Sequence, residues 1–300
     1  MMNLPKIKSP RLILEEKKAM IEWANTIIQG ILTGGLYAMF AAGLAIIFGV
    51  MRLVNITHGD LIVLAAFIGM VVIEATGFNP FLSLIIVIPI MFLIGYMLQR
   101  GILNFTLGDD LLPPLLVTFG LSIVIQNILL EIFSADSQRL KAGVVETSSI
   151  ELIEGISIGI FPLIIFFTAL LMIILLQQIF NRTRLGRAFR ATSDDTITAQ
   201  LMGINHKHIF GLAMAVAMVL VGIAGMLMAI RSNFDPSIGP TRLLYAFEAV
   251  IIGGLGSLWG TLIGGIILGI AQNIGAKIDP GWQILAGHVA FLIVLVLKPN

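Results

Sequence analysis

The sequence contains no cysteine, and only 12% of its 300 residues are Asp, Glu, Lys or Arg. The lack of cysteine excludes disulfides, thiol chemistry and thiolate metal sites. Soluble domains carry about 25% charged residues, so this chain has far less charge than a soluble protein of its length. The formal net charge is +1. Nucleic-acid binding needs a strongly basic face, so we expect no nucleic-acid partner.

Motifs for several kinds of catalysis are also missing. The sequence has no GxxxxGK[ST] phosphate loop and no arrangement of a nucleophile with a base. His206 and His208 would diverge on a helix and have no third ligand nearby, so they do not predict a metal site. We therefore expect no catalytic residue, metal or cofactor. Any work against a gradient would need an ion or another subunit as its energy source.

Apolar residues dominate what is present. They make up 58% of the chain, and the mean hydropathy is +1.01. This composition predicts an all-α, polytopic transmembrane bundle of about eight or nine spans, some of them broken or short, because a spanning helix needs about 20 apolar residues. The predicted spans are 26–48, 61–77, 81–100, 112–133, 157–180, 208–230, 243–256, 259–277 and 282–297.

The N-terminus differs from the rest. Residues 1–25 are charged and lack the long apolar stretch and cleavage site of a signal peptide. We expect a short interfacial helix from about Arg11 to Trp23, followed by a single membrane domain over 26–300.

The segment 181–207 is polar and basic, with four arginines within nine positions. Basic loops of this length are retained in the cytoplasm, so this segment fixes the predicted orientation. With nine spans, the N-terminal tail then lies outside although it is basic. Either that tail is exported against the rule, or the region 26–77 crosses differently.

Two interruptions break the apolar pattern. The first, at 49–67, contains Asn55, His58, Gly59 and Asp60. Asn55 and Thr57 are placed to cap the following helix, and Asp60 suits its positive N-terminal end. The alternative is direct contact with a solute, because ionisable groups at membrane depth usually face water or protein.

The second interruption, at 247–269, contains Glu248 and the glycines Gly253, Gly254 and Gly256. Closely spaced glycines allow helix backbones to approach or permit a broken helix buried in protein. Glu248 either reaches water at the outer rim or faces a pathway. Paired interruptions in two halves of a chain are typical of transporters with internal repeats.

A polar stripe marks the predicted span 112–133, where Thr118, Ser122 and Gln126 recur every four residues. Such a stripe either lines a pathway or forms hydrogen bonds to neighbouring helices.

Five motifs together resemble the permeases of branched-chain amino-acid ABC importers. They are GGLYAMFAAGLAIIFGVMRLVNITHGDLIVLAAF (34–67), TFGLSIVIQN (118–127), RLGRAFRATSDDTITAQLMGIN (184–205), FEAVIIGGLGSLWGTLIGG (247–265) and VLKP (296–299). They follow the family's order over most of the chain. Glu248 departs from the pattern, since the family has a small or hydroxyl residue there.

The resemblance implies an ABC importer permease in a bacterial or archaeal inner or plasma membrane. Its implied partners are a second permease subunit, identical or sibling, two cytoplasmic ATPase subunits, an extracytoplasmic binding protein and a small-molecule solute. Branched-chain or other hydrophobic amino acids are the expected cargo. The alternatives are urea, short amides or another small polar solute, and an ion-coupled secondary transporter.

The segment 181–207 would be the loop that couples to the ATPase. Residues 188–202 are predicted to form one helix, with Gly203 as its C-cap. The predicted coupling residues are Arg187, Arg190, Asp194, Asp195, Ala199, Gly203 and Ile204. The predicted residues of the translocation pathway and its broken helices are Asn55, His58, Gly59, Asp60, Ser122, Gln126, Glu248, Gly253, Gly254 and Gly256.

Overall fold

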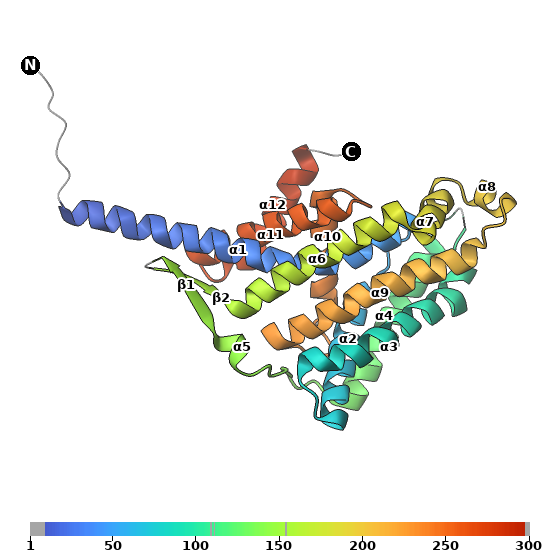
Figure 1. Cartoon of the computed structure of the whole chain (residues 1–300), viewed down its shortest axis with the longest axis horizontal. Helices are drawn as coiled ribbons and strands as arrows, with labels where there is room; N and C mark the ends of the chain where they lie inside the picture. Colours follow the sequence, from blue (N-terminus) through green and yellow to red (C-terminus); the bar gives the residue numbers. More distant parts are fainter. Residues whose placement is uncertain (1–9, 109, 111, 154, 298–300) are drawn as a thin grey trace, which may run out of the picture.

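The computed structural model describes residues 10–108, 110, 112–153 and 155–297 (Figure 1). Residues 1–9 of the predicted charged tail and the end of the VLKP motif lie outside the described residues. The long helices are α1 (Pro10–Met51), α2 (His58–Thr76), α3 (Pro80–Gly101), α4 (Leu112–Phe133), α6 (Ile160–Arg182), α9 (His206–Arg231), α10 (Gly239–Gly253), α11 (Leu258–Ile278) and α12 (Trp282–Leu297). The short elements are η1 (Leu103–Phe105), α5 (Val144–Thr147), β1 (Ser149–Ile153), β2 (Ile156–Gly159), α7 (Arg184–Asp194) and α8 (Thr196–Leu201).

The predicted all-α membrane fold is confirmed. Within the described residues, seven helices are long and apolar enough to cross a membrane: α1, α2, α3, α4, α6, α9 and α11. The remaining two predicted spans correspond to α10 and α12, which have 15 and 16 residues. A helix rises about 1.5 Å per residue, so neither covers the roughly 30 Å of hydrocarbon as a straight helix.

The first helix is longer than expected. We predicted an interfacial helix ending near Trp23 and a separate span, but α1 runs unbroken through 42 residues. No glycine or proline follows Pro10 until Gly30, so nothing in the sequence breaks the helix at the polar–apolar boundary. At about 1.5 Å per residue α1 is roughly 60 Å long, and its first turns extend beyond the bundle (Figure 1).

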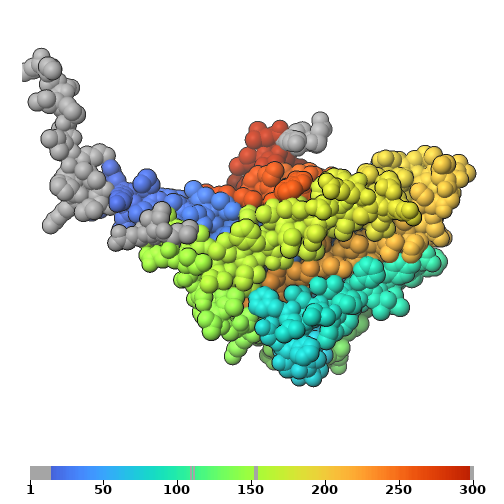
Figure 2. All heavy atoms as spheres, viewed as in Figure 1, coloured from blue at the N-terminus to red at the C-terminus, as the bar shows by residue number. Residues whose placement is uncertain are grey.

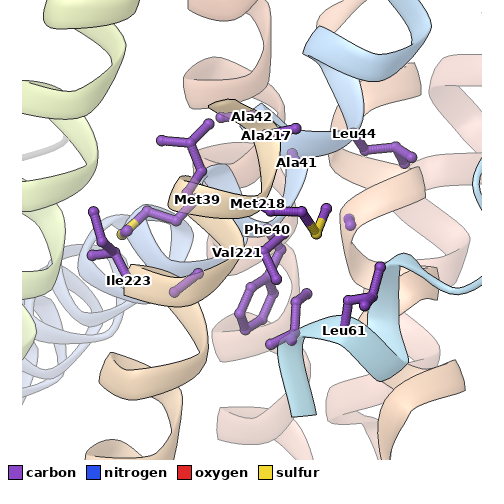
Figure 3. Packing of buried hydrophobic residues seen from close by; sticks show 14 of the residues in the cluster. Met39, Phe40, Ala41, Ala42, Leu44, Leu61, Ala217, Met218, Val221 and Ile223 are labelled. Atoms are coloured by element: carbon purple, nitrogen blue, oxygen red, sulfur yellow. The ribbon is translucent and has the colours of Figure 1, made fainter. Parts of the chain in front are cut away.

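The core is centred on α1 and α9, the two most buried helices, and α2 packs against α9. Figure 3 shows Met39 and Phe40 of α1 among Ala217, Met218 and Val221 of α9. Alanines and methionines are frequent at this contact. Small residues let helices approach closely in a membrane protein, where lipid already satisfies apolar surface. Methionine fills the irregular gaps that remain.

Glycines set the contact between α1 and α11, the most extensive helix pair. A Cβ atom on Gly34 would lie 2.5 Å from Ile266 Cα, and one on Gly265 would lie 2.5 Å from the Gly34 carbonyl oxygen. The two backbones are therefore in direct contact, as the glycine spacing in the sequence indicates.

The segment between the predicted spans 112–133 and 157–180 contains structure that we did not expect. It includes α5 and the strand β1, which pairs with β2 in an antiparallel hairpin from Ser149↔Gly159 to Ile153↔Ile156. This hairpin and α7–α8 occupy opposite ends of the molecule (Figures 1 and 2). The side-chain amide of Gln29 donates to the Ser157 carbonyl at 3.0 Å. The early part of α1 therefore lies at the hairpin end, opposite the basic segment.

Candidate translocation and coupling sites

At the first interruption, residues 49–67, the chain reverses direction and runs back along the bundle. Helix α1 ends at Met51, and Arg52 has a positive φ of 52°, which reverses the chain. His58, the first residue of α2, donates from Nε2 to the Phe40 carbonyl at 2.8 Å. Phe40 lies 11 residues before Met51, or about 16 Å along α1. Residues 53–57 therefore return alongside α1, and α2 begins deep inside the bundle.

Asn55 shapes this return segment. Its Oδ1 accepts from the Thr57 N–H at 3.1 Å and from the Thr57 hydroxyl at 2.5 Å. Thr57 is the N-cap residue of α2, as predicted, but it makes no side-chain bond to the helix, so the predicted side-chain cap is not formed. Asn55 instead closes a tight turn before the helix, because its short amide bonds the backbone two residues on.

A second segment returns from the opposite end. Residues 232–238 connect α9 to α10, and Phe234 packs edge-on against Phe67 with ring centroids 5.0 Å apart. The segment then reaches the start of α2, where a Cβ atom on Gly59 would lie 2.0 Å from the Gly239 carbonyl oxygen. The N-terminal ends of α2 and α10 thus meet inside the bundle. The sequence indicated the break before α10 but not this contact.

Asp60 lies at the meeting point. It is buried, and it accepts hydrogen bonds from the Ser122 hydroxyl at 2.5 Å and the Gln126 amide at 2.9 Å. Positive helix N-termini favour a carboxyl group at this place. The structure therefore brings Asp60 together with Ser122 and Gln126 of α4, two members of the predicted polar stripe. In the single chain these two residues bond a neighbouring helix.

Glu248 belongs to a different buried cluster. It is 1% exposed, so in this chain it does not reach water at the rim, and it is hydrogen-bonded to His288 of α12. Close by, the Tyr37 hydroxyl donates to the Gln272 amide oxygen at 2.5 Å, and the rings of Tyr37 and Tyr245 lie 5.1 Å apart. Sequence reasoning missed His288. A histidine within an otherwise apolar 16-residue helix was the available signal.

The predicted glycines 253, 254 and 256 lie away from both clusters, at the turn between α10 and α11. Gly253 contacts Gly260, where added Cβ atoms would each lie 2.0 Å from the other residue's carbonyl oxygen. Gly254 and Gly256 have positive φ angles of 94° and 81°. These values require glycine or strain, which explains why the turn is rich in glycine.

The basic segment forms two helices where we predicted one over 188–202. Helix α7 ends at Asp194, and α8 begins at Thr196. Asp195 separates them and caps α8, with its Oδ1 accepting from the N–H groups of Ile197 at 2.9 Å and Thr198 at 3.0 Å. The Thr198 hydroxyl and N–H lower the pKa of the Asp195 carboxyl. Aspartate prefers capping positions, which explains the break.

Gly203 ends the coupling segment with a positive φ of 84°. Its N–H donates to the Gln200 carbonyl at 2.9 Å, and the Ile204 N–H donates to the Ala199 carbonyl at 3.0 Å. These two bonds form a Schellman motif with Gly203 just after the cap residue Met202. Ala199 is buried and Ile204 is half-buried, so both hold α8 against the bundle.

The outer face of α8 is apolar and exposed. Ile197, Leu201 and Met202 are 72%, 83% and 80% exposed, and α8 lies near the tip of this end (Figure 1). Sequence reasoning did not single out these three residues. Of the predicted coupling residues, Arg187 is exposed, and the Arg190 guanidinium donates to the Phe180 carbonyl. Arg190 and Asp194 both face a cavity between α7 and α1.

These features define a multi-pass α-helical membrane protein of the transporter class, with two helices that begin inside the bundle and a capped helix pair exposed at one end. A protein-family model described as "Branched-chain amino acid transport system / permease component" matches residues 26–297. The chain therefore belongs to this permease family.

Individual relatives agree with the family match. The chain is 26% identical to the high-affinity branched-chain amino acid transport system permease protein BraD of Pseudomonas aeruginosa, over 93% of this chain and 94% of that protein. It is 25% identical to the permease protein LivH of Escherichia coli, over 91% of this chain and 92% of that protein. It also resembles the fructose import permease protein FrcC of Rhizobium meliloti, with 28% identity over 74% of this chain and 62% of that protein.

Proposed function

We propose that this chain is the membrane-spanning permease subunit of an ABC importer for branched-chain and other hydrophobic amino acids. Residues 26–300 form the permease domain, in the inner or plasma membrane of a bacterium or archaeon. The chain forms the solute pathway with a second permease subunit. Two ATPase subunits drive the cycle from the cytoplasm, and a binding protein delivers the solute from outside.

The exposed apolar face of α8 is the observation that carries this proposal. Three large apolar side chains, on α8 and its cap residue Met202, are exposed beside the arginines of α7. A small helix with capped ends is well suited to transmit motion as a rigid body. Its apolar residues offer a central contact, and the arginines of α7 offer a polar rim, for a soluble partner. We propose that this partner is an ATPase, which fits the match to the permease family.

Helix α4 supports a second permease subunit as the other partner. Only 17% of an 18-residue apolar stretch of α4 is buried within this chain, against 89% of the corresponding stretches of α1 and α9. Its open face carries Asn127 and also Gly120, around which no atom of this chain lies within 4 Å of an added Cβ. Small and polar residues are typical of helix–helix interfaces in membranes. The same helix bonds Asp60, so pairing through α4 would place Asp60 beside the pathway.

The names of the relatives support the proposed cargo. BraD and LivH match nearly the whole chain and are named for branched-chain amino acids, whereas FrcC matches a smaller share and is named for a sugar. We therefore propose an amino-acid cargo over urea, short amides or other polar solutes. Neither of the two buried clusters presents paired free carboxylates, so no observation favours an ion-coupled transporter.

Reconstitution tests the proposal. The chain is expressed and purified together with an ATPase and a binding protein from the same organism, and is placed in proteoliposomes with internal ATP. We expect import of radiolabelled L-leucine that requires all components and hydrolysable ATP. Import of urea or fructose in place of leucine would overturn the proposed cargo. Leucine import by this chain alone would overturn the proposed mechanism.

A further inference from the structure

A cavity of about 440 Å³ lies at the α7–α8 end of the molecule, apart from the clusters around Asp60 and Glu248. Its walls are the last turns of α1 and α6, the inner face of α7, and the first turn of α11. This volume falls within the range of about 300–1,000 Å³ that is usual for small-molecule sites.

The cavity contains one cationic and one anionic side chain. Arg190 and Asp194 both line it and lie one turn apart on α7. Residues four apart on a helix are neighbours and pair readily. Among the described residues, however, no ion pair joins these two side chains, the Asp194 carboxylate makes no hydrogen bond, and the Arg190 guanidinium donates only to the Phe180 carbonyl. The polar side chains of Gln177 and Asn181 on α6 are also without a described partner.

Helix ends add matching polarity. The N-terminus of the 21-residue α11 reaches the cavity, where Ser257 accepts from the Gly260 N–H at 3.0 Å. The N–H groups of Leu258 and Trp259 belong to the first turn of α11 and have no acceptor among the described residues. The C-terminal turn of α1 forms the other wall at Gly49 and Val50. Helix N-termini favour anions and helix C-termini favour cations.

The remaining lining is apolar and includes Ile46, Val50, Phe180 and Leu258. We propose that this cavity binds a zwitterionic, apolar α-amino acid from the α7–α8 end of the transporter. Its carboxylate is held by Arg190 and the start of α11. Its ammonium group is held by Asp194 and the end of α1, and its side chain lies on the apolar wall. The choice of a branched-chain side chain rests on the proposed function.

Tryptophan fluorescence provides a local test, because Trp259 lines the cavity. The other two tryptophans, Trp23 and Trp282, are replaced by phenylalanine in the full-length chain, which is then placed in phosphatidylcholine nanodiscs without ATPase or binding protein. We expect L-leucine to change Trp259 emission saturably. The half-ligands 3-methylbutylamine and 4-methylpentanoate should bind at least tenfold more weakly, since each lacks one of the two charges.

Matched variants localise the effect. Asp194→Asn and Arg190→Gln should each weaken leucine binding at least tenfold. Glu74→Gln removes an exposed carboxylate from the end of α2 and should leave binding unchanged. Far-ultraviolet circular dichroism in the same nanodiscs reports whether the variants keep their helices.

Three results would overturn the inference: no leucine response in the folded chain, equal binding of the amine or the acid alone, or loss of leucine binding in phosphatidylethanolamine nanodiscs. The last result would assign the cavity to a lipid headgroup, which is also zwitterionic. The import assay described above separates the two proposals. Leucine import without binding in this cavity refutes only the inference, whereas binding without import refutes only the proposed function.

Discussion

Gly59 and Gly239 meet backbone to backbone, at the first turn of α2 and the first residue of α10. A Cβ atom on Gly59 would lie 2.0 Å from the Gly239 carbonyl oxygen, and one on Gly239 would lie 2.0 Å from Asp60 Oδ1. Two segments that return from opposite ends of the bundle are therefore joined at one point. Any side chain at either position would push the two helix starts apart and displace Asp60.

Gly59→Ala is expected to destabilise the folded chain by about 3 kcal/mol, the upper part of the usual range for overpacking, because the clashing atoms are backbone and cannot rotate away. Thermal unfolding in detergent measures this effect. Gly101→Ala is the matched control, since no atom lies within 4 Å of its added Cβ. Equal melting temperatures for the two variants would contradict the close contact.

The bonds from α4 to Asp60 should be measurable as a coupling free energy. Ser122→Ala and Asp60→Asn, alone and together, form a double-mutant cycle, and we expect a coupling of about 0.6–2 kcal/mol, as for other hydrogen bonds between membrane helices. Denaturant unfolding in mixed micelles gives the four free energies. Thr118→Ala serves as the control, because the Thr118 hydroxyl donates within its own helix, to Leu115. Additive effects of Ser122→Ala and Asp60→Asn would refute the bond.

Most of the fold could be predicted from composition and apolar runs. A helix in lipid must satisfy its own backbone hydrogen bonds, so a spanning helix is recognised by the length of its apolar run. The unbroken helix α1 could not be predicted in this way, because whether a helix continues past the membrane boundary depends on packing as well as on local propensity. The sequence also did not predict that residues 53–57 and 232–238 turn back into the bundle. Extended segments bury their polar groups against distant helices, and these contacts leave no periodic pattern in the sequence.

The candidate site residues were partly predictable for the same reason. Asp60, Ser122 and Gln126 are polar residues in apolar surroundings, so each was conspicuous, but their mutual hydrogen bonds depend on how α2 and α4 pack. His288 was overlooked although it is equally conspicuous, because the short helix α12 had no motif around it. Ile197, Leu201 and Met202 are apolar residues in a polar segment. Only their exposure distinguishes them, and exposure is a property of the folded chain.

Cysteine labelling can test the orientation directly, because the natural chain contains no cysteine. Thr147→Cys places a thiol at the hairpin end, and Gln200→Cys places one on α8; both positions are exposed. A membrane-impermeant maleimide applied to intact cells should label only Thr147→Cys, and permeabilised cells should show both. The cysteine-free parent gives the background. Labelling of Gln200→Cys in intact cells would reverse the orientation.

The apolar face of α8 should carry most of the affinity for the ATPase. Leu201→Ser combined with Met202→Ser should weaken ATPase binding by at least 30-fold, because truncating a central interface residue typically costs about 2 kcal/mol or more. Binding of the purified ATPase to the permease in nanodiscs gives the affinity. Val144→Ser alters an equally exposed apolar residue at the opposite end and should have no effect. An unchanged affinity in the double variant would exclude α8 from the interface.

Substitutions at Gly203 test backbone strain without a steric clash, because the φ angle of Gly203 is 84° and no atom lies within 4 Å of an added Cβ. A side chain fits there, but a residue other than glycine must adopt the left-handed conformation, at a cost of roughly 1–2 kcal/mol that asparagine tolerates best. Gly203→Val should therefore open the Schellman motif, loosen α8, and abolish solute-stimulated ATPase activity without reducing membrane insertion. Gly203→Asn should retain most of that activity. Full stimulation in Gly203→Val would show that the fixed end of α8 is not needed for coupling, whereas equal loss in both variants would show that the side chain itself, and not the backbone conformation, disturbs the contact.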